Sequence, residues 1–435
     1  MALITPFRAL RYSTDRVPNL AEVVAPPYDV IDAQAQEALY ARSPYNCVHL
    51  ILARGEDRYA RAAADLEAWR REGVLVQDAD PGFYIVEDRY RVRGGVAGDT
   101  ELRRLGLVCL ARIESPDAGV ILPHERTMAA PREDRLRLMR AVDAQLSQIL
   151  MLTPDRDGRF ESLCEKALGE EVLAEFDGVQ GAHHRLARVI SPALLAEFQE
   201  TLRDRPLLIA DGHHRYETAR AYRDARRAEA PGDREGSKPY DHVMVLIASM
   251  DDPGTSVLGY HRIVRETGVE SGALRERLGK AFALEKVVGS DGAAAHAALL
   301  EAMDSARDSG CAAFGLALKG EENFYLLKRK RDASAPIREQ LDVAVLHGEI
   351  FGKILGMTEK DFTEQRRIDY TADPERALSL VGGGTHAAAF LLNPTPPAEV
   401  LAVAQEGHVM PQKSTYFYPK LLTGLTFHLM GTDTL

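Results

Sequence analysis

A short stretch in the middle of the sequence combines residue types that are suited to bind and transfer a phosphate group. Four apolar residues, Leu207 to Ala210, are typical of a buried strand, and a helical pattern begins after Gly212 and runs to about Ala228. At the junction stand a carboxylate, two imidazoles and a guanidinium: Asp211, His213, His214 and Arg215. Backbone N–H groups at a helix start favour an anion, and an arginine adds a planar fork that suits phosphate. We therefore predict that this strand–helix corner binds phosphate; the alternative is that Asp211 only caps the helix.

Two further segments carry polar groups that could complete such a site. After the apolar pair Ile121-Leu122, the sequence places an imidazole, a carboxylate, a guanidinium and a hydroxyl in succession: His124, Glu125, Arg126 and Thr127. Near the end of the chain, the segment from Met410 to Lys420 contains two lysines and a serine that are suited to contact phosphate: Lys413, Ser414 and Lys420. The alternatives are a solvated turn for the first segment and an amphipathic terminal strand for the second.

Three other patterns resemble binding motifs but have simpler explanations. The tripeptide His183-His184-Arg185 repeats part of the central stretch without its strand–Asp–Gly context, so we interpret it as a coincidence. His49 lies in an apolar run, Cys47 to Leu52, that predicts a buried strand, where a histidine is usually a hydrogen-bonded core residue. Gly382 to Gly384 precede a strand, whereas phosphate loops precede helices, so they predict a helix end and a turn.

The composition is that of an ordinary globular chain and argues against several classes of protein. The 435 residues are 45% hydrophobic and 27% charged, and the net charge of −11 disfavours non-specific binding to nucleic acid. The sequence has no apolar run that is long enough to span a bilayer, and its first residues lack a signal-peptide core. The cysteines are scattered without metal-ligand spacing and indicate small core residues in a reducing compartment: Cys47, Cys109, Cys164 and Cys311. We expect a cytoplasmic protein with no nucleic-acid or membrane partner.

The hydrophobic periodicity predicts a mixed α/β (α+β) fold. Helices are expected at residues 33–42, 57–72, 132–142, 160–176, 213–228, 273–283, 293–309, 341–355 and 374–381, and a further helix is expected to start at Ser191-Pro192. Strands are expected at residues 4–12, 47–52, 82–92, 101–113, 146–152, 186–190, 207–210, 243–248, 257–264, 311–318, 324–328 and 387–392, with a hairpin loop at 94–99. We predict an N-terminal α/β region, 1–265, that carries the central stretch, and a C-terminal α/β lobe, 266–435, whose tail at 410–424 returns to the site.

Several motifs together resemble the family catalogued as domain of unknown function 1015. The matching motifs are Ala25–Ile31 (APPYDVI), Pro44–Leu50 (PYNCVHL), Pro123–Thr127 (PHERT), Ala210–Thr218 (ADGHHRYET) and Met410–Gly424 (MPQKSTYFYPKLLTG), and they occur in order over almost the whole chain. The sequence departs from the pattern at His261-Arg262, where a threonine is expected after Tyr260, and at Leu186-Ala187, where an aromatic residue is expected. These departures put the roles of neighbouring residues in doubt. The family name by itself implies no activity.

The central stretch also has a more distant resemblance. The sequence from Asp211 to Arg215, between a short strand and a helix, is similar to the signature of the ParB/sulfiredoxin superfamily. Members of that superfamily place nucleotide phosphates on this corner: some bind and hydrolyse CTP, sulfiredoxins use ATP on a sulfinic acid, and others phosphorylate free serine. The resemblance implies a ParB/sulfiredoxin-like, free serine kinase-like nucleotide-binding core with an additional α/β lobe.

From these residues we predict a nucleotide-dependent phosphotransferase (a kinase) that acts on a small hydroxylated metabolite, with free L-serine as the leading acceptor. The expected cofactors are ATP or ADP and Mg²⁺. Phosphoryl transfer needs mainly positioning and charge stabilisation, which a cluster of cationic and amide groups supplies. The expected nucleotide- and phosphate-binding residues are Gly212, Arg215, His124, Arg126, Thr127, Lys413, Ser414 and Lys420.

The expected catalytic residues are Glu125, Asp211, His213 and His214. Glu125 is the candidate general base for the acceptor hydroxyl, with His124 close by. Asp211 would face the Mg²⁺ ion or fix a histidine tautomer. The two histidines would contact phosphate oxygens or help to transfer protons, while the lysines of the C-terminal segment neutralise charge.

Two other functions remain as alternatives. A metal-dependent hydrolase is one, because His124, Glu125, Asp211, His213 and His214 include ligand types that zinc accepts. Against it, adjacent histidines on a helix point about 100° apart and rarely bind one metal. A non-catalytic nucleotide sensor is the other, and the negative net charge disfavours a DNA-partitioning relative. The oligomeric state is left open, with a homodimer as one alternative.

Overall fold

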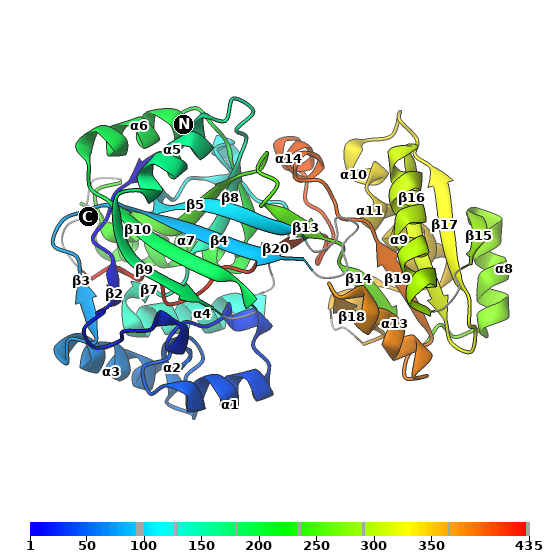
Figure 1. The fold of residues 1–435 in the computed structure, drawn as a ribbon, viewed down its shortest axis with the longest axis horizontal. Helices are drawn as coiled ribbons and strands as arrows, with labels where there is room; N and C mark the ends of the chain where they lie inside the picture. The colour runs from blue at the N-terminus through cyan, green and yellow to red at the C-terminus, as the bar shows by residue number, and fades with distance from the viewer. Residues whose placement is uncertain are drawn as a thin grey trace. The chain divides into compact units, whose positions relative to one another are not determined.

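A computed structural model describes residues 1–92, 100–125, 127, 129–178, 181–232, 236–288, 292–363 and 366–431, and every structural statement below concerns these residues. The chain has the expected mixed α/β structure and divides into two compact units (Figure 1). Unit 1 contains Met1–Arg91, Thr100–Thr255 and the segment that begins at Pro419, while unit 2 contains Ser256–Tyr418. Unit 1 is therefore built from two parts of the chain that are far apart in sequence. The sequence prediction instead divides the chain into two consecutive segments, 1–265 and 266–435. In the described part of the chain, no helix combines the length and apolar character that crossing a membrane requires.

A nine-stranded mixed sheet forms the centre of unit 1. In spatial order its strands are β6 (Ile121–Leu122), β11 (Leu207–Asp211), β8 (Ile149–Thr153), β12 (His242–Ser249), β5 (Glu101–Arg112), β4 (Phe83–Arg91), β10 (His183–Val189) and β9 (Glu171–Asp177), and β1 (Ile4–Thr5) pairs with β5. β8 runs parallel to β12 and β11 runs parallel to β6, while the other neighbours are antiparallel. All residues of β8 and β12 are buried, because both faces of the sheet are covered at its centre.

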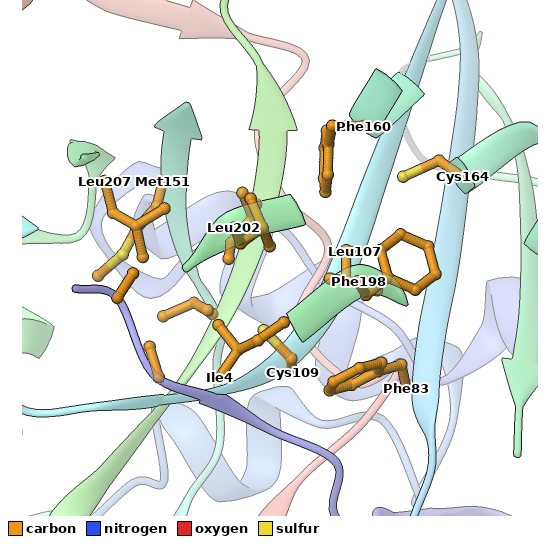
Figure 2. Packing of buried hydrophobic residues seen from close by; sticks show 14 of the residues in the cluster. Ile4, Phe83, Leu107, Cys109, Met151, Phe160, Cys164, Phe198, Leu202 and Leu207 are labelled. Atoms are coloured by element: carbon orange, nitrogen blue, oxygen red, sulfur yellow. The ribbon is translucent and has the colours of Figure 1, made fainter. Parts of the chain in front are cut away.

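One face of this sheet packs against helices α5 (Arg159–Leu168) and α6 (Pro192–Leu202). The buried positions of α5 recur every three or four residues, so the helix has one apolar stripe that faces the sheet. Phe198 of α6 is the centre of an aromatic group, with its ring centroid 5.9 Å from that of Phe83 and 6.2 Å from that of Phe160 (Figure 2). Tyr216 and Ala219 of α7 (His213–Glu229) belong to the same core, which therefore anchors the helix that follows the central stretch.

The opposite face of the sheet carries a buried ion pair that holds the C-terminal segment. Side chains alternate along a strand, so Arg104 of β5 faces away from the core around Leu105 and Leu107. Arg104 donates to Asp88 Oδ2 through Nη2 at 2.6 Å and to the carbonyl oxygen of Pro419 through Nη1 at 2.8 Å. The chain is thereby fixed at the residue directly before Lys420.

Unit 1 also contains further helices, short 3₁₀ turns and two pairs of short strands. The helices are α1 (Ala33–Arg42), α2 (Val48–Ile51), α3 (Arg58–Arg71) and α4 (Ala129–Val142), and 3₁₀ turns occur at Leu20–Glu22, Tyr28–Val30, Pro116–Ala118 and Pro239–Asp241. β2 (Leu10–Tyr12) pairs with β3 (Leu75–Gln77), and β7 (Ala144–Gln145) pairs with β21 (His428–Leu429). Helix α4 packs against both α3 and α7, and so connects the N-terminal helices to the helix of the central stretch.

Unit 2 is built on a six-stranded antiparallel sheet. Its strand order is β15 (Ala283–Val287), β17 (Phe324–Lys330), β16 (Cys311–Leu318), β19 (Ala388–Leu392), β14 (His261–Val264) and β18 (Ile368–Thr371), and β13 (Ser256–Leu258) pairs separately with β20 (Tyr416–Tyr418). The helices are α8 (Ser271–Ala281), α9 (Gly292–Asp308), α10 (Ile337–Gln340), α11 (Asp342–Val345), a π-helix at Leu346–Ile354, α12 (Glu359–Thr363), α13 (Pro374–Gly382) and α14 (Pro397–Gln405). Leu299 and Met303 of α9 pack with Leu391 of β19 in its core.

Four predictions about local structure are wrong. The apolar run at 47–52 contains the helix α2 and no strand, because a short buried run of apolar residues has no periodicity that separates the two. The helix expected at 160–176 ends at Leu168, and the edge strand β9 follows after Gly169. The strand expected at 257–264 is divided at Gly259, where a Cβ atom would lie 2.1 Å from the carbonyl oxygen of Leu392. The strand expected at 4–12 is also divided, into β1 and β2.

Most of the remaining local predictions are confirmed, including α1, α3, α6, α7 and the hairpin partners β4 and β5. Three of the cysteines are buried and all four are free thiols. Gly382 ends α13 and Gly384 has φ +73°, as a helix end and a turn require. His183-His184-Arg185 lies inside strand β10, so it does not form a second strand–helix corner. The hairpin loop predicted at 94–99 lies outside the described residues.

Candidate functional site

The central stretch forms the predicted strand–helix corner. β11 ends at Asp211, α7 begins at His213, and the first bond of the helix runs from the amide of Tyr216 to the carbonyl oxygen of Gly212 at 3.0 Å. The amide groups of the first turn, from His213 to Arg215, are therefore not used within the helix. Such groups, together with the positive end of the helix dipole, favour a negatively charged ligand.

Gly212 is required at this corner for two separate reasons. Its φ of +99° lies in the left-handed region, which residues with a side chain rarely adopt. A Cβ atom at this position would also lie 2.9 Å from both Cζ and Nε of Arg215. The guanidinium therefore lies directly against the backbone of the turn.

A carboxylate and two cations meet at the end of β11. Lys420 Nζ donates to Asp211 Oδ2 at 3.0 Å, and Arg215 Nη2 lies 3.6 Å from Asp211 Oδ1. Arg215 also donates through Nη1 to the carbonyl oxygen of Gln148. Burial alone would raise the pKa of Asp211, but Lys420 and Arg215 outweigh it and hold that pKa well below its usual range. The ionised group of three carries one net positive charge, which suits an anionic ligand.

His124 and His213 join the 123–127 segment to this corner. The amide of His124 donates to Nε2 of His213 at 3.2 Å, and the two rings meet edge to face with centroids 4.5 Å apart. Nδ1 of His124 lies 2.7 Å from the carbonyl oxygen of Ile209, which can only accept, so Nδ1 carries the proton. Burial lowers the pKa of His124 to about 4 and that of His213 well below its usual value. Both rings are therefore neutral at pH 7.

These two histidines make unit 1 sensitive to acid. Their pKa values are lower in the folded protein than the value of about 6.5 in an unfolded chain, so between pH 6.5 and 4 the unfolded state binds more protons. We expect the free energy of unfolding to fall as the pH is lowered through this window, by at most about 1.4 kcal/mol per pH unit for each histidine. Urea denaturation of the full chain at pH 7, 6 and 5 measures this slope.

His124→Asn should reduce the pH dependence of the free energy of unfolding, whatever the substitution does to stability at pH 7. His183→Gln is the control, because hydrogen bonding to Asp177 raises the pKa of His183. Removing this imidazole should leave the acid-induced fall in the free energy of unfolding in place. Parallel pH profiles for the two variants would contradict the assignment of neutral, buried His124.

A pocket of about 520 Å³ in unit 1 opens beside the corner, and Arg215 lines it. Its other polar lining includes Tyr28, Arg135 and Ser147, and much of the rest is apolar, for example Leu138, Met139 and Val243. The guanidinium of Arg135 lies over the Tyr28 ring, 4.3 Å from its centroid. Arg215 therefore belongs both to the phosphate-favouring corner and to the lining of a pocket that combines polar and apolar residues.

Sequence reasoning assigned no role to Tyr28, Arg135 or Gln148, although each lines the pocket or contacts Arg215. Tyr28 stands in the motif APPYDVI, whose two prolines signal a constrained segment, so a local signal was present. Arg135 is one of several charged residues on α4 and has no local feature that separates it from a solvated arginine. Its role depends on the packing of α4 against α3 and α7.

The structure brings most of the predicted site residues into unit 1, though not all. His124, Asp211, Gly212, His213, Arg215 and Lys420 are connected by the contacts given above, and Glu125 and His214 are their partly buried chain neighbours. Thr127 is partly buried two residues beyond Glu125. Arg126 lies outside the described residues.

Lys413 and Ser414 belong to unit 2, and the following contacts join them to other residues of that unit. The carbonyl oxygen of Lys413 accepts a hydrogen bond from Arg262 Nη2 at 3.0 Å. The Nζ atom of Lys413 lies 5.6 Å from the centroid of the Tyr260 ring. The hydroxyl of Ser414 donates to the carbonyl oxygen of Pro411. Their predicted role as phosphate ligands stays a prediction.

Asp211 does not offer a ready-made metal site. Among the residues that the structure describes, no three His, Cys, Asp or Glu side chains are placed to share a metal ion. Oδ2 of Asp211 already accepts from Lys420, so a cation bound at that oxygen would lie beside the ammonium group and be repelled by it. Mg²⁺ is commonly held by one or two carboxylates together with substrate phosphates, so these residues fit an ion that arrives with a nucleotide better than a resident one.

A model of the family described as "Protein of unknown function (DUF1015)" matches residues 4–344. The chain belongs to the DUF1015 family. This confirms the family resemblance that the sequence motifs indicated. No curated protein matches this DUF1015 chain.

Solved structures give more distant similarities. A free serine kinase in complex with AMP matches 74% of this DUF1015 chain and 92% of its own length, with 16% identity and a TM-score of 0.35. A conserved hypothetical protein from Pyrococcus furiosus matches 74% of this chain and 95% of its own, with 16% identity and a TM-score of 0.33. SbnI with a C-terminal truncation, from Staphylococcus aureus, matches 74% of this chain and 87% of its own, with 11% identity and a TM-score of 0.35.

Proposed function

We propose that this protein is a nucleotide-dependent phosphotransferase, a kinase that transfers a phosphoryl group from ATP or ADP to a small hydroxylated metabolite in the cytoplasm. Free L-serine is the leading acceptor, as the resemblance of the central stretch to the ParB/sulfiredoxin superfamily implies. One observation carries the proposal: Arg215 lies at the start of α7, against Gly212, and also lines the pocket of about 520 Å³. A ligand with an anionic tail and a less polar body matches this combination.

In this proposal the nucleotide phosphates lie at the corner. The first-turn amides of α7, Gly212 and Arg215 bind phosphate oxygens, and Lys420 is the second cation at the end of β11. The nucleoside lies in the pocket, where Leu138, Met139 and Val243 provide apolar contacts. Because both parts of the ligand contact Arg215 or its neighbours, one guanidinium couples binding of the nucleoside to the position of its phosphates.

Glu125 is the proposed general base, which accepts the proton of the acceptor hydroxyl as that oxygen attacks the phosphoryl group. It follows His124, whose amide is held by His213. Because Nε2 of His213 accepts that bond and the ring is neutral, His213 acts as a positioning residue for the Glu125 segment. His214 remains the candidate for direct contact with phosphate oxygens.

A Mg²⁺ ion that arrives with the nucleotide would neutralise phosphate charge during transfer. Asp211, held by Lys420 and Arg215, would then position the two cations, with direct coordination as the alternative role. Both assignments place the carboxylate at the end of β11, next to the phosphates.

The full chain tests this proposal directly. Purified protein is incubated with Mg²⁺, with ATP or ADP, and with L-serine, D-serine, L-threonine, L-homoserine or glycerate, and new phosphoesters are detected by ³¹P NMR and mass spectrometry. We expect one donor and one acceptor to give product. If no pair does so while the nucleotide is bound, the protein is a nucleotide-binding sensor, and tight stoichiometric zinc in chelator-free protein would favour a hydrolase instead.

A further inference from the structure

A second pocket, of about 600 Å³, lies next to the first one in unit 1. The two pockets share three lining residues, Ile51, Arg135 and Leu138. The second pocket adds charged and polar groups from α3 and α4, chiefly Arg58, Tyr59 and Asp134. It is therefore a separate space that adjoins the first pocket along these three residues.

The charged groups of this second pocket have an excess of positive charge. Asp134 Oδ1 accepts from Arg58 Nη2 at 2.8 Å and from the Tyr59 hydroxyl at 2.7 Å. Asp134 Oδ2 accepts from Arg135 through Nε at 2.8 Å and Nη2 at 2.5 Å. Burial raises the pKa of Asp134, but the Tyr59 and arginine contacts outweigh it and lower that pKa, so the carboxylate is ionised at pH 7. One carboxylate thus faces two guanidinium groups, and its own oxygens are already occupied.

The two arginines differ in how they are held. Arg135 is 12% exposed and also donates to the carbonyl oxygen of Ile51 at 2.7 Å, so it is fixed in place. Arg58 is 49% exposed and can turn towards a ligand while its helix stays in place. The remaining lining is partly apolar, with Leu50, Leu52 and Ala53. An anion attached to a short carbon chain matches this pocket better than a sugar or a neutral alcohol does.

We propose that this second pocket binds the carboxylate of the acceptor, with Arg58 and Arg135 as its specificity-determining residues. The acceptor is then a hydroxylated carboxylic acid. That this acid is the phosphoryl acceptor rests on the proposed phosphotransfer, whereas binding of its carboxylate in the second pocket does not. Binding is therefore measured in the absence of a nucleotide.

The experiment is isothermal titration of the full chain with four probes: L-serine, glycerate, serinol and inorganic phosphate. Serinol has the hydroxyl and amino groups of serine without the carboxylate. We expect L-serine or glycerate to bind, and serinol to bind at least about tenfold more weakly, because it lacks the charge-assisted hydrogen bonds to arginine. Inorganic phosphate should not displace the carboxylate at equal concentration. Carboxylates that bind no better than serinol, or phosphate that displaces them fully, would overturn the proposal.

Two arginines of α3 provide a matched pair of variants. Arg58→Met removes the half-exposed guanidinium of the pocket and should weaken carboxylate binding about tenfold, with nucleotide affinity unchanged. Arg61→Met removes a similarly exposed guanidinium, 52% exposed and paired with Asp57, and should leave carboxylate binding unchanged. Equal affinities in the two variants would overturn the role of Arg58. If carboxylates bind through Arg58 but no donor yields a phosphoester, the carboxylate site stands and the proposed phosphotransfer fails.

Discussion

Arg215→Gln should lower kcat/KM of the proposed phosphotransfer by about 10²- to 10³-fold, since removing one preorganised group that stabilises transition-state charge has an effect of that size. Glutamine keeps a hydrogen-bond donor but loses the charge and the fork geometry. The variant also leaves Asp211 with Lys420 as its cation partner, which preserves the carboxylate in its ionised form. Steady-state kinetics with the active donor and acceptor measure the loss, and titration with the nucleotide separates binding from turnover.

Two further variants of α7 residues make this test specific. Arg215→Lys keeps the charge without the planar fork, and we expect it to recover less than half of the loss on a free-energy scale. Arg220→Gln changes an arginine of the same helix that pairs with Glu217 at 2.8 Å, and it should retain the kinetics of the parent protein. Parent-like turnover and nucleotide affinity in Arg215→Gln would remove the corner from the mechanism.

Gly212→Ala should have an effect on activity close to that of Arg215→Gln. The new Cβ atom would lie 2.9 Å from the guanidinium carbon, and a flexible side chain gives way more easily than the backbone, so Arg215 is displaced from its contacts. The left-handed φ of +99° adds a conformational cost of about 1 kcal/mol or more to the folded state. We therefore expect a lower unfolding midpoint together with a loss of about 10²-fold or more in kcat/KM.

Gly158 provides the control for this prediction. It precedes α5 as Gly212 precedes α7, and it also has a left-handed φ, of +65°. Nothing lies within 4 Å of the position that its Cβ atom would occupy. Gly158→Ala should thus lose a similar amount of stability through its backbone and keep full activity. Comparable activity in the two alanine variants would show that displacement of Arg215 is not the cause.

The sequence contains enough local information to predict the strand–helix corner. Apolar residues before Asp211, a glycine that permits a left-handed turn and a helical pattern after it all act on neighbouring residues, and β11 and α7 have the predicted boundaries within a few residues. The same kind of reasoning failed for the run at 47–52, because four buried residues are too few to reveal a period. It also extended α5 through Gly169 into β9, whose strand conformation depends on pairing with β10.

By itself, the sequence determined the family, the mixed α/β class and the chemical character of the corner, because these depend on residue types and on short-range order along the chain. The tertiary structure decided which distant groups join that corner. Lys420 reaches Asp211 from 209 residues away, since Arg104 holds the carbonyl group of Pro419 on the sheet. Tyr28 and Arg135 line a pocket with Arg215 through the packing of helices that no local pattern specifies. Such contacts arise when whole elements bury their apolar faces together, and the positions of side chains far apart in sequence follow from that packing.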